Sequence, residues 1–356
     1  MTGEITTTSV RGEPLITRYR GLICDLDGVV YRGATAVPHA VETLNQVTAH
    51  GLPVVFATNN ASRPPEDVGD HLRGLGVAQQ GWSVVNSSQA AAAHLATFLA
   101  PGARVCAVGG PGVAHALTEA GLNSVRVADL DGTPVEAVVQ GLGFDVTWRE
   151  LAAVGHLVEA GAIWVATNVD LTLPTPHGRA PGNGALVALV QTATSASPHV
   201  VGKPQAALFD VARSRLGTDQ LDTLVCGDLL GTDIEGANSA GLDSLFVLSG
   251  SSRLRDLALA EQSARPTYVA ADLSGLLAPG LPLHTTSPEY LVELGPDAVP
   301  RMPSAGDSGK LLQSVVTTAW AARDNGRAIS DDAGLWGEIE RQLGLGQPDE
   351  STRLTR

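Results

Sequence analysis

Two carboxylates one residue apart, Asp25 and Asp27, follow the apolar residues 22–24 and precede Gly28. An apolar run that ends in acids and a glycine is typical of a buried strand whose carboxyl end opens into a loop. Because side chains alternate along an extended chain, the two acids could face one site. Like charges about 4 Å apart cost about 4 kcal/mol at an effective dielectric of about 20, so the pair needs a cation, a raised pKa or both. A solvated turn is the other interpretation of this stretch.

Further strand-like runs also end in polar residues. In chain order these residues are Thr58-Asn59-Asn60 after residues 52–57, Lys203 after Val200-Val201, and Asp228 with Asp233 after residues 221–226. Phosphoryl transfer needs such a set: a nucleophile, a proton donor, a divalent cation and donors that neutralise the equatorial oxygens. Each motif alone is weak, and a solvated lysine in a turn is the other interpretation of Lys203. Their order predicts a phosphoryl-transfer site.

The surrounding sequence predicts the elements that must position these residues. Residues 22–85 have a β-α-β-α-β pattern, with helices expected at 38–50 and 66–75, which implies parallel strands with right-handed crossovers. A second α/β unit begins at about residue 86. Beyond about residue 282 an amphipathic helix is expected, with apolar residues on one face: Leu311, Leu312, Val315, Val316, Ala319 and Trp320.

Composition limits the partners and the compartment. The 356 residues are 44% hydrophobic, and 37 acidic residues outnumber 23 basic ones, for a net charge of -14. Without a basic patch, nucleic acid and anionic membranes are not expected partners. No apolar run reaches about 18 residues, residues 1–9 lack a signal pattern, and the three cysteines, Cys24, Cys106 and Cys226, lie in apolar runs. We expect a cytoplasmic protein with buried, reduced thiols.

The ordered motifs resemble those of the haloacid dehalogenase superfamily, whose members carry Asp-x-Asp, Ser/Thr, Lys and Gly-Asp motifs on a Rossmann-like core. The strings that carry the resemblance to its para-nitrophenyl phosphatase-like branch are Asp25-Leu-Asp-Gly-Val-Val-Tyr31, Thr58-Asn-Asn60, residues 168–174 with 181–184, and Val201-Gly-Lys-Pro204. The resemblance covers about residues 18–275, and with its tail the chain is similar to bacterial glycerol 3-phosphate phosphatases. It implies an α/β fold with a Rossmann-like parallel-sheet core (1–86 and 181–280), an inserted α/β cap (87–180) and a small C-terminal appendage (281–356).

The resemblance also implies a role for each motif residue. Asp25 would attack phosphorus and form an aspartyl phosphate, and Asp27 would protonate the leaving alcohol and later activate water. Lys203 would offset the negative charge. Thr58 and Asn59, with the neighbouring Asn60, would hold phosphate oxygens. Mg2+ would be bound by the Asp25 carboxylate, the Asp27 carbonyl and Asp228, with Asp233 behind them. Leu229 and Gly231 depart from the branch, which usually has an Arg and a further acid there.

The expected substrate is a small phosphate monoester, with glycerol 3-phosphate as the best candidate and sugar phosphates, nucleoside monophosphates or pyridoxal phosphate as alternatives. Because the motif residues contact only the phosphate, we expect Asp170 and His177 on a cap loop, facing Arg63, to select the leaving group; a solvated surface loop is the other interpretation. The oligomeric state stays open, although the cap could pair two chains as a homodimer.

Three other hypotheses compete with this interpretation. The segment Asp129-Leu-Asp-Gly-Thr133, with Thr167-Asn168 downstream, also matches the opening motif but lacks its apolar continuation. A phosphoaccepting signalling module also combines acids, a Thr and a Lys around Mg2+, but such modules are far shorter and need no cap. A non-catalytic binding protein is disfavoured by the intact acids and lysine. Steady phosphate release would separate the enzyme from the last two hypotheses.

Overall fold

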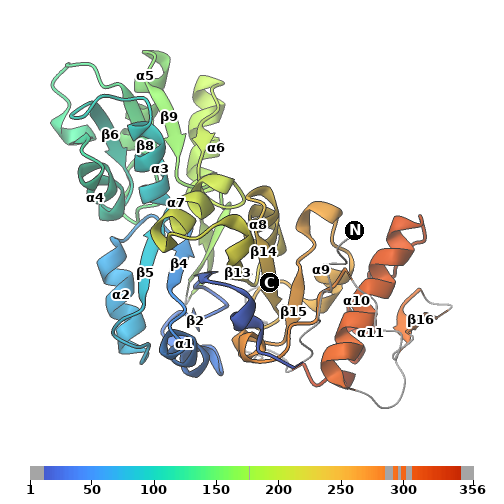
Figure 1. The fold of residues 1–356 in the computed structure, drawn as a ribbon. Coiled ribbons are helices and arrows are strands. Elements are labelled where there is room, and N and C mark those ends of the chain that lie inside the picture. Colours follow the sequence, from blue (N-terminus) through green and yellow to red (C-terminus); the bar gives the residue numbers. More distant parts are fainter. Residues whose placement is uncertain (1–11, 176, 285–291, 296–297, 302–306, 346–356) are drawn as a thin grey trace, which may run out of the picture.

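The computed structural model describes residues 12–345 except 176, 285–291, 296–297 and 302–306 (Figure 1). The polar residues 1–9 therefore lie outside the described part of the chain. Figure 1 shows three parts: a core, a cap above the core and a C-terminal appendage beside the core. Within the described residues, no helix is both long enough and apolar enough to cross a bilayer.

A six-stranded parallel sheet forms the core. Its strands, in spatial order, are β15 (Tyr268–Ala270), β14 (Asp243–Val247), β13 (Thr223–Gly227), β1 (Gly21–Cys24), β4 (Val54–Thr58) and β5 (Trp82–Asn86). The central strand β1 pairs with β13 on one side and with β4 on the other, so that Cys24 lies opposite both Cys226 and Phe56. The polar residues that follow these strands therefore meet at one edge of the sheet, as expected.

Alternation along the strands builds two hydrophobic layers on opposite faces of the core sheet. Ile23 and Val55 pack on the side of α3 (Ser87–Ala96), α7 (Ala206–Leu216) and α8 (Glu235–Ser239). Leu22 and Phe56 pack on the side of α1 (Ala40–Ala49) and α2 (Pro65–Gly74). Because helices cover both faces of the sheet, its strands are fully buried. Their sequences are therefore continuous apolar runs. A short hairpin, β2 (Tyr31–Arg32) and β3 (Thr35–Ala36), follows β1.

The cap has its own parallel sheet of five strands. In spatial order these are β12 (His199–Val200), β9 (Ile163–Ala166), β8 (Ala137–Gln140), β6 (Arg104–Val108) and β7 (Asn123–Arg126). Its helices are α4 (Pro111–Glu119), α5 (Trp148–Glu159) and α6 (Asn183–Thr194), and an antiparallel hairpin, β10 (Thr172–Thr175) with β11 (Gly178–Pro181), follows β9. The cap is thus the inserted α/β unit that the sequence predicts.

The return from the cap to the core lies later in the chain than residue 181, the boundary expected from sequence. Val187 and Val190 of α6 pack into the cap core with Val154 of α5, and β12 pairs with β9 as the edge strand of the cap sheet. The Pro-Gly-Asn-Gly turn at 181–184 does begin a helix, but the apolar side of that helix faces the cap. Two elements assigned to the core, α6 and β12, therefore belong with the cap sheet.

The appendage packs beside the β15 edge of the core sheet (Figure 1). It contains α10 (Ser308–Asp324), α11 (Ala333–Gln342) and the short strands β16 (Glu293–Leu294) and β17 (Pro300–Arg301). The apolar face predicted for α10 is buried against α9 (Leu254–Ala258) and Phe246 of β14. Trp320 donates its indole hydrogen bond to the Leu257 carbonyl at 2.8 Å, which fixes α10 on the core. The predicted docking helix is confirmed.

All three cysteines are buried and unpaired, as predicted. Cys24 and Cys226 lie opposite each other on β1 and β13. Burial raises the pKa of both thiols, so each stays protonated and unreactive near neutral pH. The cysteines therefore act as small apolar core residues.

Candidate active site

The ammonium group of Lys203 forms the centre of an acidic cluster at the carboxyl ends of β1 and β13. Lys203 Nζ donates hydrogen bonds to Asp25 Oδ1 and, at 2.7 Å, to Asp233 Oδ1. The Lys203 side chain is only 4% exposed, and Asp233 is buried as well. A buried charge needs such partners, because an unpaired one would cost several kcal/mol. Burial by itself would lower the pKa of Lys203, but the carboxylates of Asp233 and Asp25 raise it, so the lysine stays charged.

Asn59 holds the backbone of Lys203 from the end of the neighbouring strand β4. Its Oδ1 accepts the Lys203 backbone N–H at 2.8 Å, and its Nδ2 donates to the Lys203 carbonyl at 3.1 Å. Gly202 makes this approach possible, because a Cβ there would overlap the Thr167 carbonyl. The Asn59 side chain therefore positions the lysine.

Asp233 and Asp228 are fixed by the turn that follows β13. Asp233 lies in the π-helical turn Leu230–Ile234, and its Oδ2 accepts the backbone N–H groups of Asp228 at 3.2 Å and Leu229 at 3.1 Å. Asp228 Oδ2 in turn accepts the Ser251 backbone N–H at 2.5 Å. A Cβ at Gly250 would overlap the Asp228 carboxyl group, so only glycine fits there. The residues after β14 were not singled out by the sequence, although a Ser-Gly-Ser-Ser run at a strand end was visible.

The cluster suits a divalent cation. Carboxylate oxygens of Asp25, Asp228 and Asp233 lie within 4.8 Å of one another, and hard oxygen donors are the ligands that Mg2+ prefers. Burial raises the pKa of Asp25 well above its usual range, against the opposing effect of Lys203. Burial and the neighbouring Asp233 raise the pKa of Asp228 to about 7. A single lysine does not balance these acids, and a bound cation would hold them ionised.

Asp27 lies in the turn that leads from β1 into the β2–β3 hairpin. The turn is closed by the Gly28 N–H, which donates to the Tyr31 carbonyl at 2.8 Å. Partial loss of water raises the pKa of the Asp27 carboxyl, and the charges of Lys203 and Arg63 oppose that shift. Asp25 and Asp27 line the same cavity, which agrees with the expectation that residues two apart face one site.

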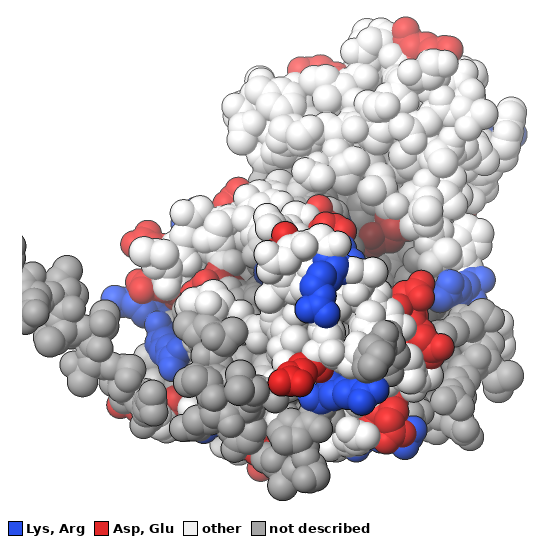
Figure 2. Space-filling model, turned by 90° about the vertical axis from the view of Figure 1, so that its right-hand side faces the viewer, with Lys and Arg blue, Asp and Glu red and all other residues white. Residues whose placement is uncertain are grey.

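That cavity, of about 610 Å³, lies between the core and the cap. Figure 2 shows a recess between the two parts, below a cap face that carries few charged residues. The predicted site residues that line the cavity are Asp25, Asp27, Thr58, Asn59, Asn60, Arg63, Asp170, Lys203, Asp228 and Asp233. Asp170 is held by Asn59, whose Nδ2 lies 3.2 Å from Asp170 Oδ2, so the cap loop reaches the side chain that positions Lys203.

His177 is the predicted site residue that the structure places elsewhere. It is exposed at the tip of the β10–β11 hairpin and is not among the described residues that line the cavity. Its backbone N–H donates to Thr175 Oγ1 at 3.3 Å within this tight turn. The structure therefore separates His177, at the tip of the hairpin, from Asp170, which precedes the hairpin and lines the cavity.

Other residues of the cavity wall were missed by the sequence analysis. His71 of α2 contacts the Tyr31 ring edge-on, with centroids 4.7 Å apart, and both line the cavity. On the cap side the wall includes Phe144 and Leu171. Single apolar or aromatic residues in loops carry no motif, so only the position of the cap over the core could reveal them.

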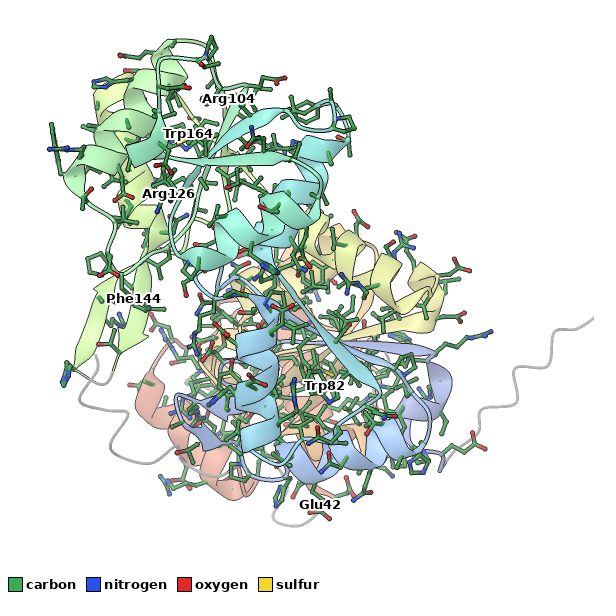
Figure 3. The ribbon with its side chains drawn as sticks, turned by 90° about the vertical axis from the view of Figure 1, so that its left-hand side faces the viewer. Glu42, Trp82, Arg104, Arg126, Phe144 and Trp164 are labelled. Atoms are coloured by element: carbon green, nitrogen blue, oxygen red, sulfur yellow. The ribbon has the colours of Figure 1, made fainter. Side chains whose placement is uncertain are left out.

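The alternative motif at 129–133 lies away from this cavity. Asp129 is exposed and pairs with Arg126, with Oδ2 2.7 Å from the Arg126 Nε, while Asp131 pairs with Arg104 at 2.9 Å. Figure 3 shows Arg104 and Arg126 on the cap, far above the core. Arg126 lowers the pKa of Asp129, as expected for a surface ion pair. Within residues 129–133, the acids pair with surface arginines, unlike Asp25, which bonds the buried Lys203.

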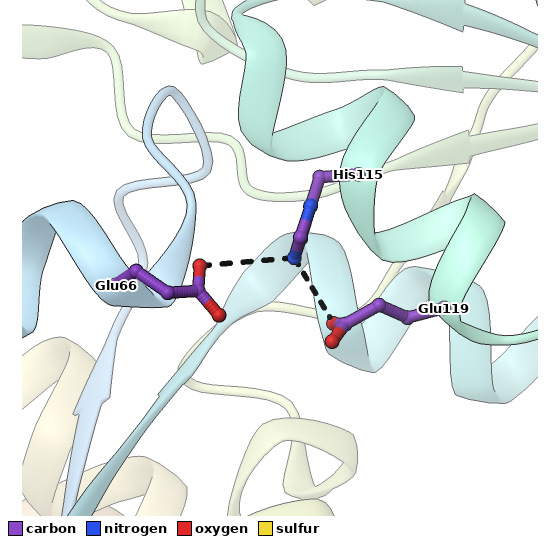
Figure 4. A group of neighbouring side chains, drawn as sticks. All are labelled: Glu66, His115 and Glu119. Carbon is purple, nitrogen blue, oxygen red and sulfur yellow. Dashed lines mark ion pairs between the residues drawn. The ribbon is translucent and has the colours of Figure 1, made fainter.

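A second group of ligand-type side chains lies where the cap meets the core (Figure 4). His115 of α4 lies between two carboxylates, with Nε2 3.7 Å from Glu66 of α2 and 3.5 Å from Glu119. All three side chains are at least one-third exposed, so these contacts are surface ion pairs that form when the histidine is protonated. They tie α4 to α2.

The chain matches models of known families at both ends of the core. Residues 22–123 match the family described as haloacid dehalogenase-like hydrolase, and residues 200–276 match a second HAD-hydrolase-like model. These segments contain Asp25, Thr58, Lys203 and Asp228.

Relatives and solved structures extend the likeness over most of the chain. A D-glycerol 3-phosphate phosphatase of Mycobacterium tuberculosis is 42% identical over 311 residues, which are 85% of this chain and 86% of that protein. An acid sugar phosphatase of Staphylococcus aureus is 34% identical over 73% of this chain and 98% of its own length.

The crystal structure of a glycerol phosphate phosphatase from M. tuberculosis in complex with magnesium superposes with a TM-score of 0.82 at 38% identity, covering 94% of this chain and all of that one. A thermostable phosphatase structure from Geobacillus stearothermophilus superposes with a TM-score of 0.64 at 33% identity, over 72% of this chain and 97% of its own. The chain belongs to the haloacid dehalogenase-like hydrolase family and is a phosphatase.

Proposed function

We propose that the protein hydrolyses glycerol 3-phosphate, with Asp25 as the residue that accepts the phosphoryl group. The observation that carries this proposal is the cluster in which Lys203 bonds Asp25 beside Asp228 and Asp233, at the closed end of a cavity between core and cap. The 42% identity to a D-glycerol 3-phosphate phosphatase supports the choice of substrate.

In the first step a carboxylate oxygen of Asp25 attacks phosphorus and the bond from phosphorus to the leaving oxygen breaks. The Lys203 ammonium lies against the attacking carboxylate and balances the charge that the incoming phosphate adds. Asp27, in its protonated form, gives its proton to the leaving alkoxide. Its raised pKa favours the protonated carboxyl that this step needs.

In the second step water attacks phosphorus of the aspartyl phosphate, and Asp27, now ionised, takes the proton from that water. Phosphate leaves and Asp25 is restored as a carboxylate, so both acids return to their starting forms. Asp25 and Asp27 line one cavity, which lets the same carboxyl group serve both half-reactions.

Asp25, Asp228 and the Asp27 carbonyl would hold Mg2+, with Asp233 behind them fixing Lys203 and the Asp228 backbone. When bound, Mg2+ supplies positive charge that orients the phosphate and lowers the repulsion between its oxygens and the carboxylates. Thr58 and Asn60, which line the cavity beside Asp25, would contact the remaining phosphate oxygens.

Arg63 and Asp170 would meet the leaving group. Both line the cavity, Arg63 from the loop after β4 and Asp170 from the loop after β9. A polyol offers hydroxyl groups to a carboxylate and a guanidinium, and a site built for such hydrogen bonds rejects analogues that lack the hydroxyls. The sequence predicts that the core residues contact the phosphate and that the cap loop selects the leaving group. This selection by the cap is part of the proposal.

Hydrolysis of a sugar phosphate is a second candidate function, favoured by the 34% identity to an acid sugar phosphatase. A panel of glycerol 3-phosphate, sugar phosphates, nucleoside monophosphates and pyridoxal phosphate, assayed for phosphate release with and without Mg2+, tests both candidates. We expect the largest kcat/KM for glycerol 3-phosphate. A larger value for a sugar phosphate would replace the first candidate by the second.

A homodimer formed through the cap and a cytoplasmic location stay predictions from sequence. The edge strands of the cap sheet, β7 and β12, are the elements at which two caps could pair. Light scattering of the purified protein would give its mass directly, and a monomer at all concentrations would rule the dimer out.

A further inference from the structure

The appendage packs against one end of the loop that fixes Asp228. This loop, residues 249–253, lies between β14 and α9 and is called the serine loop after its sequence, Ser-Gly-Ser-Ser-Arg. Leu254, the first residue of α9, is fully buried in a hydrophobic cluster that also contains Trp336 and Ile339 of α11. Figure 1 shows α9 beside the appendage helices α10 and α11. The end of the serine loop is therefore anchored on the appendage.

The serine loop also holds the turn that carries Asp228. Besides the bond from the Ser251 N–H to the Asp228 carboxyl group, the Ser252 N–H donates to the Asp228 carbonyl at 3.1 Å. Ser252 Oγ accepts the backbone N–H of Leu230 at 3.2 Å. Asp228 and Ser252 are both buried. The orientation of the Asp228 carboxyl group therefore depends on where the serine loop lies.

One polar side chain of the appendage bonds directly to the end of the serine loop. Glu340 Oε1 of α11 accepts the backbone N–H of Leu254 at 3.1 Å. Because Leu254 begins α9, this N–H has no partner within the helix. The preceding N–H, that of Arg253, donates to Asp256 Oδ2 at 2.8 Å. Side chains thus fix the point at which the loop becomes a helix, and one of them comes from the appendage.

We propose that Glu340 is a positioning residue for the metal site: it fixes the end of the serine loop, and the loop fixes the Asp228 carboxyl group. This inference rests on the proposed function, which assigns Asp228 to Mg2+, and it gives the appendage a role in that site. A carboxyl group that must first be ordered binds a cation less tightly than one that is already held in place. Residues that orient a metal ligand without touching the metal change its affinity in this way.

Isothermal titration of the full chain with Mg2+ alone, without substrate, tests the proposal. Glu340→Ala should raise the Kd for Mg2+ about threefold to tenfold, the range that the loss of one hydrogen bond represents. Glu340→Asp should do the same, because it keeps the charge but withdraws the oxygen by one methylene. Glu340→Gln should bind Mg2+ like the wild type, since its carbonyl oxygen can still accept the Leu254 N–H.

Glu338→Ala is the matched control on the same helix. Glu338 is about half exposed and pairs with Arg341 and Gln342 of α11 itself, so the variant should keep the wild-type Kd. Circular dichroism at the temperature of the titration shows whether each variant is folded. Because Glu340→Gln changes a single atom group, the comparison of Gln with Asp stays informative even where Glu340→Ala does not fold.

The outcomes separate this proposal from the proposed function. Mg2+ binding by the folded Glu340→Ala and Glu340→Asp variants with the wild-type Kd would overturn the positioning role and leave the proposed function standing. No Mg2+ binding by the wild type would overturn both. Equal weakening in Glu340→Gln and Glu340→Asp, or in Glu338→Ala and Glu340→Ala, would assign the effect to something other than the hydrogen bond to Leu254 and overturn the positioning role.

Discussion

The two walls of the cavity differ in how firmly their side chains are held. On the core wall, Lys203 is buried and bonded to two carboxylates, and its backbone is fixed on both sides by Asn59. On the cap wall, Phe144 and Leu171 lie in loops and are largely exposed. The comparison indicates that the side chains around Lys203 are preorganised by buried hydrogen bonds, whereas the large apolar side chains of the cap wall are mostly exposed to solvent.

The largest expected effect is on the core wall. Asp25→Asn replaces the attacking carboxylate by an amide, a far poorer nucleophile, so phosphate release should fall to the background. That background is negligible, because enzymes accelerate monoester hydrolysis by up to about 10^21-fold. Asp129→Asn is the matched control and should keep wild-type activity, since Asp129 is exposed on the cap. An active Asp25 variant beside an inactive Asp129 variant would reverse the assignment of the motif.

The next effect is on the stability of the core wall. Lys203→Met leaves Asp25 and Asp233 buried without their shared cation. Removing one partner of a buried ion pair typically costs about 3–5 kcal/mol, so the free energy of unfolding in urea, measured without Mg2+, should fall by about that amount. Arg126→Ala, which breaks an exposed pair, should change it by about 1 kcal/mol or less. Equal small losses in both variants would show that the buried cluster does not depend on Lys203.

Mg2+ should stabilise the fold as well as support turnover. The carboxylates of Asp25, Asp228 and Asp233 repel one another, and an ion bound only by the folded state adds about 2.7 kcal/mol at a hundredfold excess over its Kd. Thermal unfolding with Mg2+ and with a chelator measures this. Ca2+ should bind with little turnover, because it tolerates looser geometry and more ligands than Mg2+. Full activity after exhaustive chelation would contradict the account of the metal.

The smallest effects concern the leaving group. Asp170→Ala removes a carboxylate that lines the cavity, and we expect kcat/KM for glycerol 3-phosphate to fall by about tenfold to a hundredfold more than kcat/KM for para-nitrophenyl phosphate. His177→Ala should change neither, since His177 is exposed and is not among the described residues that line the cavity. Equal losses on both substrates in the Asp170 variant would show that this residue does not select the alcohol.

The same contrast explains what the sequence could predict. Asp25, Thr58 and Asp228 lie at the carboxyl ends of buried parallel strands of one sheet, and these ends meet at one edge, so the three residues could be grouped from the sequence. Lys203 follows β12 of the cap sheet, so only the order of the motifs predicted its place beside them. The cap wall depends on how a second sheet lies over the first, which no local pattern encodes. For this reason Phe144 was missed, His177 was expected at the cavity although it lies at the hairpin tip, and the cap was ended before α6 and β12.

The central claim is that Asp25 carries the phosphoryl group and that Asp27 handles the proton. The most direct measurement uses Asp27→Asn with radiolabelled para-nitrophenyl phosphate, whose leaving group needs no proton. Because Asp27 is required to activate water in the second step, label should accumulate on the protein after an acid quench. Peptide mapping should place that label on Asp25, and the further change Asp25→Asn should abolish it. Label on any other residue, or free phosphate released at the wild-type rate without labelled protein, would contradict the account.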